Sequence, residues 1–289
     1  FTLSTSNDDD KVSKGIKSLN KIFISHFITD KFKGKVDLSS PNFTKLLNNF
    51  TMVIIELKYP SQHFQSMYDQ LLRAQTKNVK ICAFISGIAK TDMKFREDKN
   101  IYSIVLDNTV TAVSGGDSGN RGSFNKCSSL TNITLSDTVT TIGSFSFGDC
   151  SSLLKIFIPN SVTFIGERCF LNCSNLTEIN IPSSMSVLKS NLFYNCRSLA
   201  HIEIPNSINF VFCDCKSLME IVVPSSVTKI GMHAFSGCDG LTEMTIPDSV
   251  TSVGSGLFFR SRNLREVRIP AVIKQTNFGL EPRTTIIRT

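Results

Sequence analysis

The chain has 289 residues, of which 41% are hydrophobic and 19% are charged, and its net charge is +7. This composition is typical of a protein that forms a hydrophobic core. No run of about 18 apolar residues occurs, so the sequence predicts no membrane-spanning helix. The positive charge comes mainly from residues 1–100, which hold 16 Lys or Arg and 10 Asp or Glu. It forms no dense basic run, which indicates a solvated surface.

The first hundred residues show a mixture of helix and strand signals. Residues 1–12 are polar and predict a disordered tail. Residues 13–29 carry large apolar side chains at helical spacing (Ile16, Leu19, Ile22, Phe23 and Phe27), so we expect a helix that caps the first edge of the fold. A second helix is expected at 61–76, and strands at 52–57, 79–85 and 101–106.

This order of strand, helix and strand favours helix-bearing units that begin a repeat array, so residues 13–100 are expected to form a helical or α/β cap region. Ile81 precedes Ile104 by 23 residues, which supports the same array. A separate α/β domain is the alternative.

A 23-residue repeat occupies residues 101–275. Its clearest marker is one position per unit, called here the Cys slot, which is filled by Cys127, Cys150, Cys173, Cys196, Cys215, Cys238 and Ser261. A Phe lies three residues before every slot and a Leu three residues after it, followed by two apolar residues spaced by two. Repetition at this length is the signature of a solenoid.

The physical meaning of one unit can be read from residues 176–182. The alternation of Leu176, Ile179 and Ile181 predicts a short strand with one buried face. Pro182 ends that strand because it has no N–H for the ladder. One unit cannot bury its apolar face alone, so the units must stack, and their strands form a parallel sheet.

Two units depart from the repeat. The unit after Pro205 is four residues short, which predicts a tightened convex turn and a local kink. Another unit carries an insertion at Gly115–Asn120, which predicts a protruding loop.

The pattern AF-x-x-C-x-x-L-x-x-I-x-I-P-x-S-V-x-x-I-G resembles the BspA-like, or Treponema-type, leucine-rich repeat, and the unit from Ala234 to Gly254 matches it best. The resemblance covers residues 101–275. It implies an α/β repeat solenoid, a leucine-rich-repeat horseshoe with its parallel β-sheet on the concave face. It also implies adhesion or protein recognition, with no catalytic residues. Residues 276–289 are then expected to be a C-terminal cap or tail.

The sequence predicts neither an enzyme nor a metal or cofactor site. The slot cysteines are expected about 4.8 Å apart with parallel side chains, which is poor disulfide geometry, so we expect buried free thiols. No second Cys pair or HxxxH motif completes a zinc site around Cys213 and Cys215. The loop from Gly116 to Gly119 contains a GDSG sequence but lacks the His and Asp partners of a serine protease.

The alternation also predicts which residues face a partner. If Ile179 and Ile181 point inward, then Glu178 and Asn180 point outward, and the same phase defines two columns along the concave face. The expected partner-binding residues are Lys155, Phe157, Glu178, Asn180, His201, Glu203, Glu220, Val222, Glu243, Thr245, Glu266 and Arg268.

The first of these columns is mostly acidic. Stacked carboxylates repel one another, which favours a basic protein ligand, and they would also repel the phosphates of a nucleic acid on this face. A Glu column that only keeps the sheet in solution is the alternative.

The expected function is therefore non-enzymatic protein recognition or adhesion through the concave sheet. A structural or scaffold subunit of a larger assembly is the alternative. The sequence is compatible with a cell-surface or a cytoplasmic location.

Overall fold

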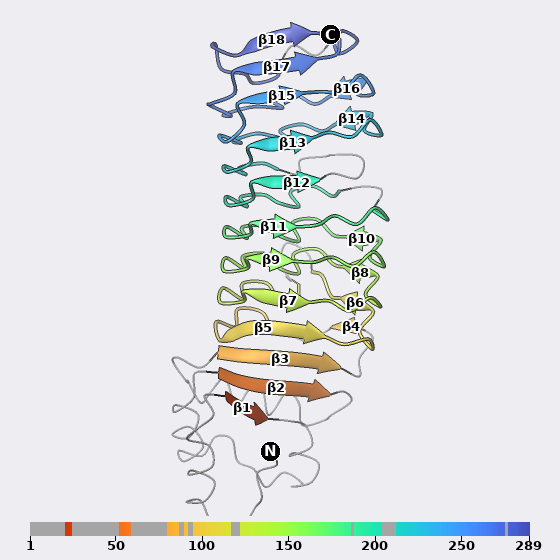
Figure 1. The fold of residues 1–289 in the computed structure, drawn as a ribbon, viewed down its shortest axis with the longest axis vertical. Coiled ribbons are helices and arrows are strands. Elements are labelled where there is room, and N and C mark those ends of the chain that lie inside the picture. The colour runs from red at the N-terminus through yellow and green to blue at the C-terminus, as the bar shows by residue number, and fades with distance from the viewer. Residues whose placement is uncertain are drawn as a thin grey trace, which may run out of the picture.

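The computed structural model describes residues 21–24, 52–58, 80–86, 90–91, 95–116, 122–185, 188–203, 212–274 and 277–289. The chain coils into a stack of turns, and each turn contributes one strand to the same side of the stack (Figure 1). Several turns add a two-residue strand on the opposite side. The predicted parallel solenoid is confirmed, whereas the described residues contain no helix, so its expected α component is absent from this part of the chain.

The front strands are those that build the main parallel sheets. They are β1 (Lys21–Ile24), β2 (Met52–Lys58), β3 (Lys80–Ser86), β5 (Ile101–Leu106), β7 (Asn132–Thr134), β9 (Lys155–Ile156), β11 (Glu178–Ile179), β12 (His201–Glu203), β13 (Glu220–Val222), β15 (Glu243–Thr245), β17 (Glu266–Ile269) and β18 (Thr285–Arg288). They pair in the orders β1-β2-β3-β5-β7-β9-β11, β12-β13 and β15-β17-β18.

The back strands are short and lie on the other side of the stack. They are β4 (Lys90–Thr91), β6 (Ala112–Val113), β8 (Thr141–Ile142), β10 (Phe164–Ile165), β14 (Lys229–Ile230) and β16 (Ser252–Val253). They pair in the orders β10-β8-β6-β4 and β14-β16.

The helix predicted over residues 13–29 is wrong at residues 21–24, which form β1. This strand pairs in parallel with β2, and Lys21 lies opposite Met52. A short apolar run such as Ile22 to Ile24 is compatible with a helix or with a buried strand. The edge of β2 offers backbone hydrogen-bond partners to this segment, and pairing with them favours the strand. Several predictions fall outside the described residues: the rest of that segment, the tail at 1–12, the helix at 61–76, residues 117–120 of the insertion and the short unit at 204–211.

The strands predicted at 52–57, 79–85 and 101–106 are confirmed as β2, β3 and β5. The expected alignment of Ile81 with Ile104 is wrong, because Ala83 lies opposite Ile104 and the register shifts between Ile81 and Cys82. Ala83 is buried as the inward residues of the later turns are. A β-bulge of this kind changes which residues pair across two strands, and the 23-residue spacing of the sequence does not reveal it.

A column of phenylalanine rings fills the core of the stack. The rings are Phe95, Phe124, Phe147, Phe170, Phe193, Phe212, Phe235 and Phe258, all buried, and each stacks on the next with centroids 5.5–6.0 Å apart. Aromatic pairs at this spacing stabilise a core beyond the area they bury. The repeated Phe therefore supplies the continuous part of the hydrophobic core.

A glycine directly follows β8, β10, β14 and β16 and allows neighbouring turns to approach closely. A Cβ atom at Gly143 would lie 2.1 Å from the backbone nitrogen of Gly115 in the turn before. No side chain fits there, so glycine at this position sets the tight stacking of the turns.

Candidate functional site

The front strands expose every second side chain. In β13, Ile221 is buried whereas Glu220 and Val222 are exposed, and β15 repeats this pattern around Met244. Successive side chains of a strand point to opposite sides of the sheet, so the outward set forms one continuous surface. We call it the strand face: the outward side chains of β7, β9, β11, β12, β13, β15 and β17, with Phe157 and Asn180 directly after β9 and β11.

The predicted partner-binding residues lie on this face. All those with described side chains are exposed, apart from the half-buried Asn180 and Glu266. Phe157 is 69% exposed and Val222 is 65% exposed, which is unusually open for large apolar side chains in contact with a sheet. The side chain of Glu203 lies outside the described residues. The part that these residues take in binding remains a prediction.

Ion pairs neutralise two members of the acidic column. Lys155 lies opposite Glu178 across β9 and β11, and the Lys155 ammonium pairs with the Glu178 carboxylate. Within β17, Nε of Arg268 donates to Oε1 of Glu266 at 3.0 Å. In the described part of the chain no ion pair or hydrogen bond engages the side chains of Glu220 and Glu243. The uncompensated negative charge of the column is therefore concentrated on β13 and β15.

Asn180 binds the backbone of the preceding turn. Its Oδ1 accepts from the N–H of Ile158 at 2.7 Å, and its Nδ2 donates to the carbonyl of Ile158 at 2.8 Å. The side-chain amide thus continues the ladder beyond the last paired residues of β9 and β11, Ile156 and Ile179. Its polar atoms are engaged in the fold, a structural role that the sequence pattern did not indicate.

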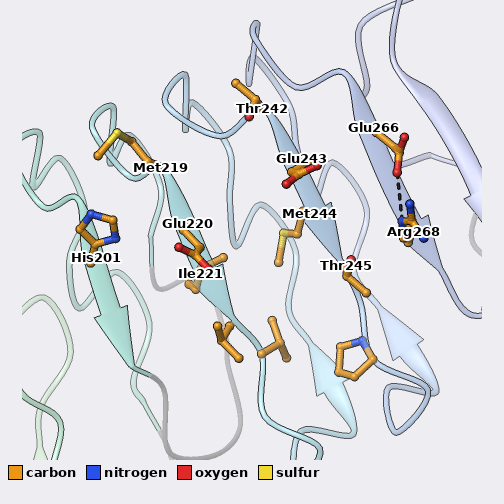
Figure 2. A pocket seen from close by; sticks show the side chains of 13 residues that line it. His201, Met219, Glu220, Ile221, Thr242, Glu243, Met244, Thr245, Glu266 and Arg268 are labelled. Carbon is orange, nitrogen blue, oxygen red and sulfur yellow. Dashed lines mark hydrogen bonds and ion pairs between the residues drawn. The ribbon is translucent and has the colours of Figure 1, made fainter.

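A groove of about 860 Å³ opens on the strand face over β12, β13, β15 and β17. Figure 2 shows His201, Glu220, Glu243 and Glu266 following one another across these four strands. The predicted residues that line it are His201, Glu220, Val222, Glu243, Thr245, Glu266 and Arg268. Lys155, Phe157, Glu178 and Asn180 do not line it and lie on earlier turns.

Two exposed lining residues, Met219 and Thr242, were missed by the sequence analysis. Each lies one position before a front strand, where strict alternation would turn its side chain toward the core. Both side chains are nevertheless exposed, and the exposed fraction of Met219 is 55%. The repeat could have indicated that this position is outward. The equivalent residues of earlier units are Thr131, Leu154, Thr177 and Ala200, and the two threonines are polar.

The groove lies where the front ladder is interrupted. One position before the strands, backbone N–H groups donate to the carbonyl one turn earlier, as from Met219 to Ala200 at 3.1 Å and from Arg265 to Thr242 at 2.8 Å. Among the described residues no such bond joins Thr242 to Met219, and β13 and β15 form no ladder although they are neighbours in the stack (Figure 1).

A second opening of about 800 Å³ adjoins the groove and is lined by residues that precede the front strands β12, β13, β15 and β17. Met219 and Thr242 line both, and Ser198, Asp239, Asn263 and Arg265 are among the further residues that line the second. The two hollows therefore meet at the interruption between β13 and β15.

The slot cysteines are buried and reduced. Burial raises the pKa of each of these thiols, and neighbouring thiols or carboxylates add to the increase for several of them. A protonated, inaccessible thiol is a poor nucleophile and a poor metal ligand. The described residues contain no group of three or more His, Cys, Asp or Glu placed to hold a metal ion.

No helix in the described ranges has the length and apolar character required to cross a bilayer. A family model described as "BspA type Leucine rich repeat region (6 copies)" matches residues 91–211 and 208–279. No curated protein matches the sequence significantly.

Several solved structures are similar to the chain. A leucine-rich repeat protein from Bacteroides ovatus is 23% identical, with a TM-score of 0.53 over 72% of this chain and 59% of its own. A leucine rich cell surface protein from Faecalibacterium prausnitzii is 17% identical, with a TM-score of 0.44 over 93% of this chain and 87% of its own. The Treponema pallidum leucine-rich repeat protein is 26% identical, with a TM-score of 0.33 over 58% of each chain. The Bacteroides likeness supports the fold, and the chain spans 59% of that protein's length.

Proposed function

Because the chain belongs to the BspA-type leucine-rich-repeat family, we propose that it is a non-enzymatic recognition or adhesion module and that its strand face binds a protein ligand. The family suggests a protein-interaction role in general. The strand face as the binding surface is the specific part of the proposal.

The observation that carries this proposal is the exposure of large apolar side chains on an otherwise charged strand face. Val222 is 65% exposed beside Glu220 and Glu243, and Met219 is 55% exposed at the edge of the same groove. Apolar side chains inside a charged rim are the usual composition of a protein-binding surface. The repeated inward residues stabilise the fold without requiring Val222 and Met219 to be exposed. Stability alone therefore does not account for these two exposed side chains.

The shape of the molecule supports the same function. Stacked turns give an extended surface on which each turn adds a few outward side chains, and repeat proteins use such surfaces for recognition. The recurrent residues of the unit, by contrast, are occupied in the core and in contacts between turns, as the Phe column is. The outward positions, which vary from turn to turn, are where specificity can reside.

Site-specific photocross-linking tests the proposal. A benzophenone amino acid placed at Thr245, on the strand face, should capture a discrete partner from a lysate or surface fraction of the source organism. The matched control places the same group at Lys229, which is also exposed but lies on β14 at the back of the stack. Capture from Lys229 alone, or with equal efficiency from both positions, would show that the strand face is not the binding surface.

A further inference from the structure

The groove over β12 to β17 has an unequal charge distribution. Glu178 lies outside it and is paired with Lys155, and Glu266 at its far edge is paired with Arg268. Glu220 and Glu243 lie inside it on adjacent strands, exposed and without a cationic partner among the described residues. Like charges on neighbouring strands repel each other, and a cation between them would relieve that repulsion.

Apolar side chains border these two carboxylates. Val222 lies on β13 two residues after Glu220, and Met219 directly precedes Glu220. Both side chains are more than half exposed. The unbranched Met side chain adapts to differently shaped partners. Arg and Lys lay their aliphatic stems on apolar surface and keep their charged heads at a polar site, so a groove that offers both features matches these two side chains.

The direction of the groove sets the shape of its occupant. It crosses four successive front strands, from His201 on β12 to Glu266 on β17, and strands in a sheet lie about 4.8 Å apart. The span from the first to the fourth strand is therefore about 14 Å, which an extended chain covers with roughly four residues. An extended segment lying along the stack axis would present alternate side chains to the groove.

We propose that this groove binds an extended polypeptide segment with Arg or Lys at every second position, so that the basic side chains all face the groove. The inference rests on the proposed function and names the chemistry of the partner. The basic heads pair with Glu220 and Glu243 where the ladder between β13 and β15 is interrupted, and the aliphatic stems of the same side chains pack on Met219 and Val222. An acidic or phosphorylated segment would meet the same carboxylates and be repelled.

Fluorescence anisotropy with synthetic peptides tests the partner chemistry. The probe is a labelled peptide of about eight residues, twice the expected span of the groove, in which Arg or Lys alternates with Val or Leu. A second peptide carries Glu or Asp at the basic positions. The basic peptide should bind to the full chain, the acidic peptide should not, and added salt should weaken the binding because ion pairs are screened.

Three variants locate the site. Glu220→Gln with Glu243→Gln keeps the shape of both side chains and removes their charge, and the dissociation constant should rise at least about tenfold. Glu167→Gln removes an exposed carboxylate that follows β10 at the back of the stack, outside the strand face, and should change it by less than about twofold. Val222→Ser should weaken binding by a smaller factor, which reports on the apolar wall.

Three outcomes would overturn the inference: no binding of the basic peptide, equal binding of the acidic one, or equal loss in the Glu167→Gln control. If capture from Thr245 still succeeds in these cases, the strand face recognises a partner of different chemistry and only this inference fails. If capture from Thr245 fails as well, the proposed function fails with it.

Discussion

The thiol of Cys173 donates a hydrogen bond to the backbone carbonyl of Phe147, one turn earlier in the stack, with 3.1 Å between Sγ and O. The same contact recurs from Cys127 to Phe95, Cys150 to Phe124, Cys196 to Phe170, Cys215 to Phe193 and Cys238 to Phe212. In the last slot the hydroxyl of Ser261 donates to Phe235 at 2.7 Å. The slot therefore requires a small buried donor that links two turns, and not a cysteine in particular.

Replacing that donor should destabilise the fold. Cys173→Ala removes this bond and leaves the carbonyl of Phe147 with the N–H of Cys150 alone, which should lower the free energy of unfolding by about 0.5–1.5 kcal/mol. Cys173→Ser keeps a donor, as Ser261 does, and should lower the free energy of unfolding by less than Cys173→Ala does. Urea unfolding followed by circular dichroism measures both. Equal loss in the two variants would mean that the thiol acts by packing alone.

The reactivity of the cysteines should follow their burial. In the folded protein near pH 8, Ellman's reagent should react only with Cys82 and Cys213, which are partly exposed, and the remaining thiols of the nine should react after unfolding. Burial raises the pKa of Cys213 as well, so its reaction should be slow. Rapid modification of a slot cysteine such as Cys150 in the native state would contradict this account.

Stability should also decrease at alkaline pH. Burial raises the pKa of the slot thiols in the folded chain, whereas a thiol in the unfolded chain ionises near pH 8.5. The unfolded state therefore binds fewer protons above that pH, so the free energy of unfolding is fully retained below about pH 8.5 and falls as the pH rises further. Urea midpoints at pH 7 and pH 10 measure the fall. A variant with Cys173→Ser and Cys196→Ser should show a smaller one, and an unchanged dependence would assign it to other groups.

The two kinds of phenylalanine should respond differently to truncation. Phe170 lies in the core column between Phe147 and Phe193, so Phe170→Ala should cost about 3–5 kcal/mol of stability. Phe157 is exposed on the strand face, and Phe157→Ala should change stability by less than about 0.5 kcal/mol. Thermal or urea unfolding distinguishes them. A large cost at Phe157 would show that its ring supports the sheet.

Asn180 should prove structural although it lies on the strand face. Asn180→Ala removes both hydrogen bonds to Ile158, and the expected cost is about 1–3 kcal/mol. Thr245 occupies the corresponding outward position of β15 without such a bond among the described residues, so Thr245→Ala serves as the control and should be close to neutral. If both substitutions are neutral, the side-chain amide of Asn180 is not needed to hold the two turns together.

Much of the fold can be read from the sequence because its determinants are local and repeated. The 23-residue spacing of Phe, Cys and Leu identified the stacked turns. The alternation in segments such as Glu220 to Val222 identified which side chains are exposed, since neighbouring residues of a strand must face opposite sides. The first-column glutamates were placed on one face for the same reason.

Only the tertiary structure decided what those residues can do. The pairing of Glu178 with Lys155, the engagement of Asn180 by Ile158 and the interrupted ladder between β13 and β15 all depend on contacts between different turns. The strand at Lys21–Ile24 likewise depends on the edge of β2. The repeat determined the arrangement of each turn because its signals lie within one unit. The position of the groove depends on how one turn meets the next, and that relationship arises only when the chain is folded.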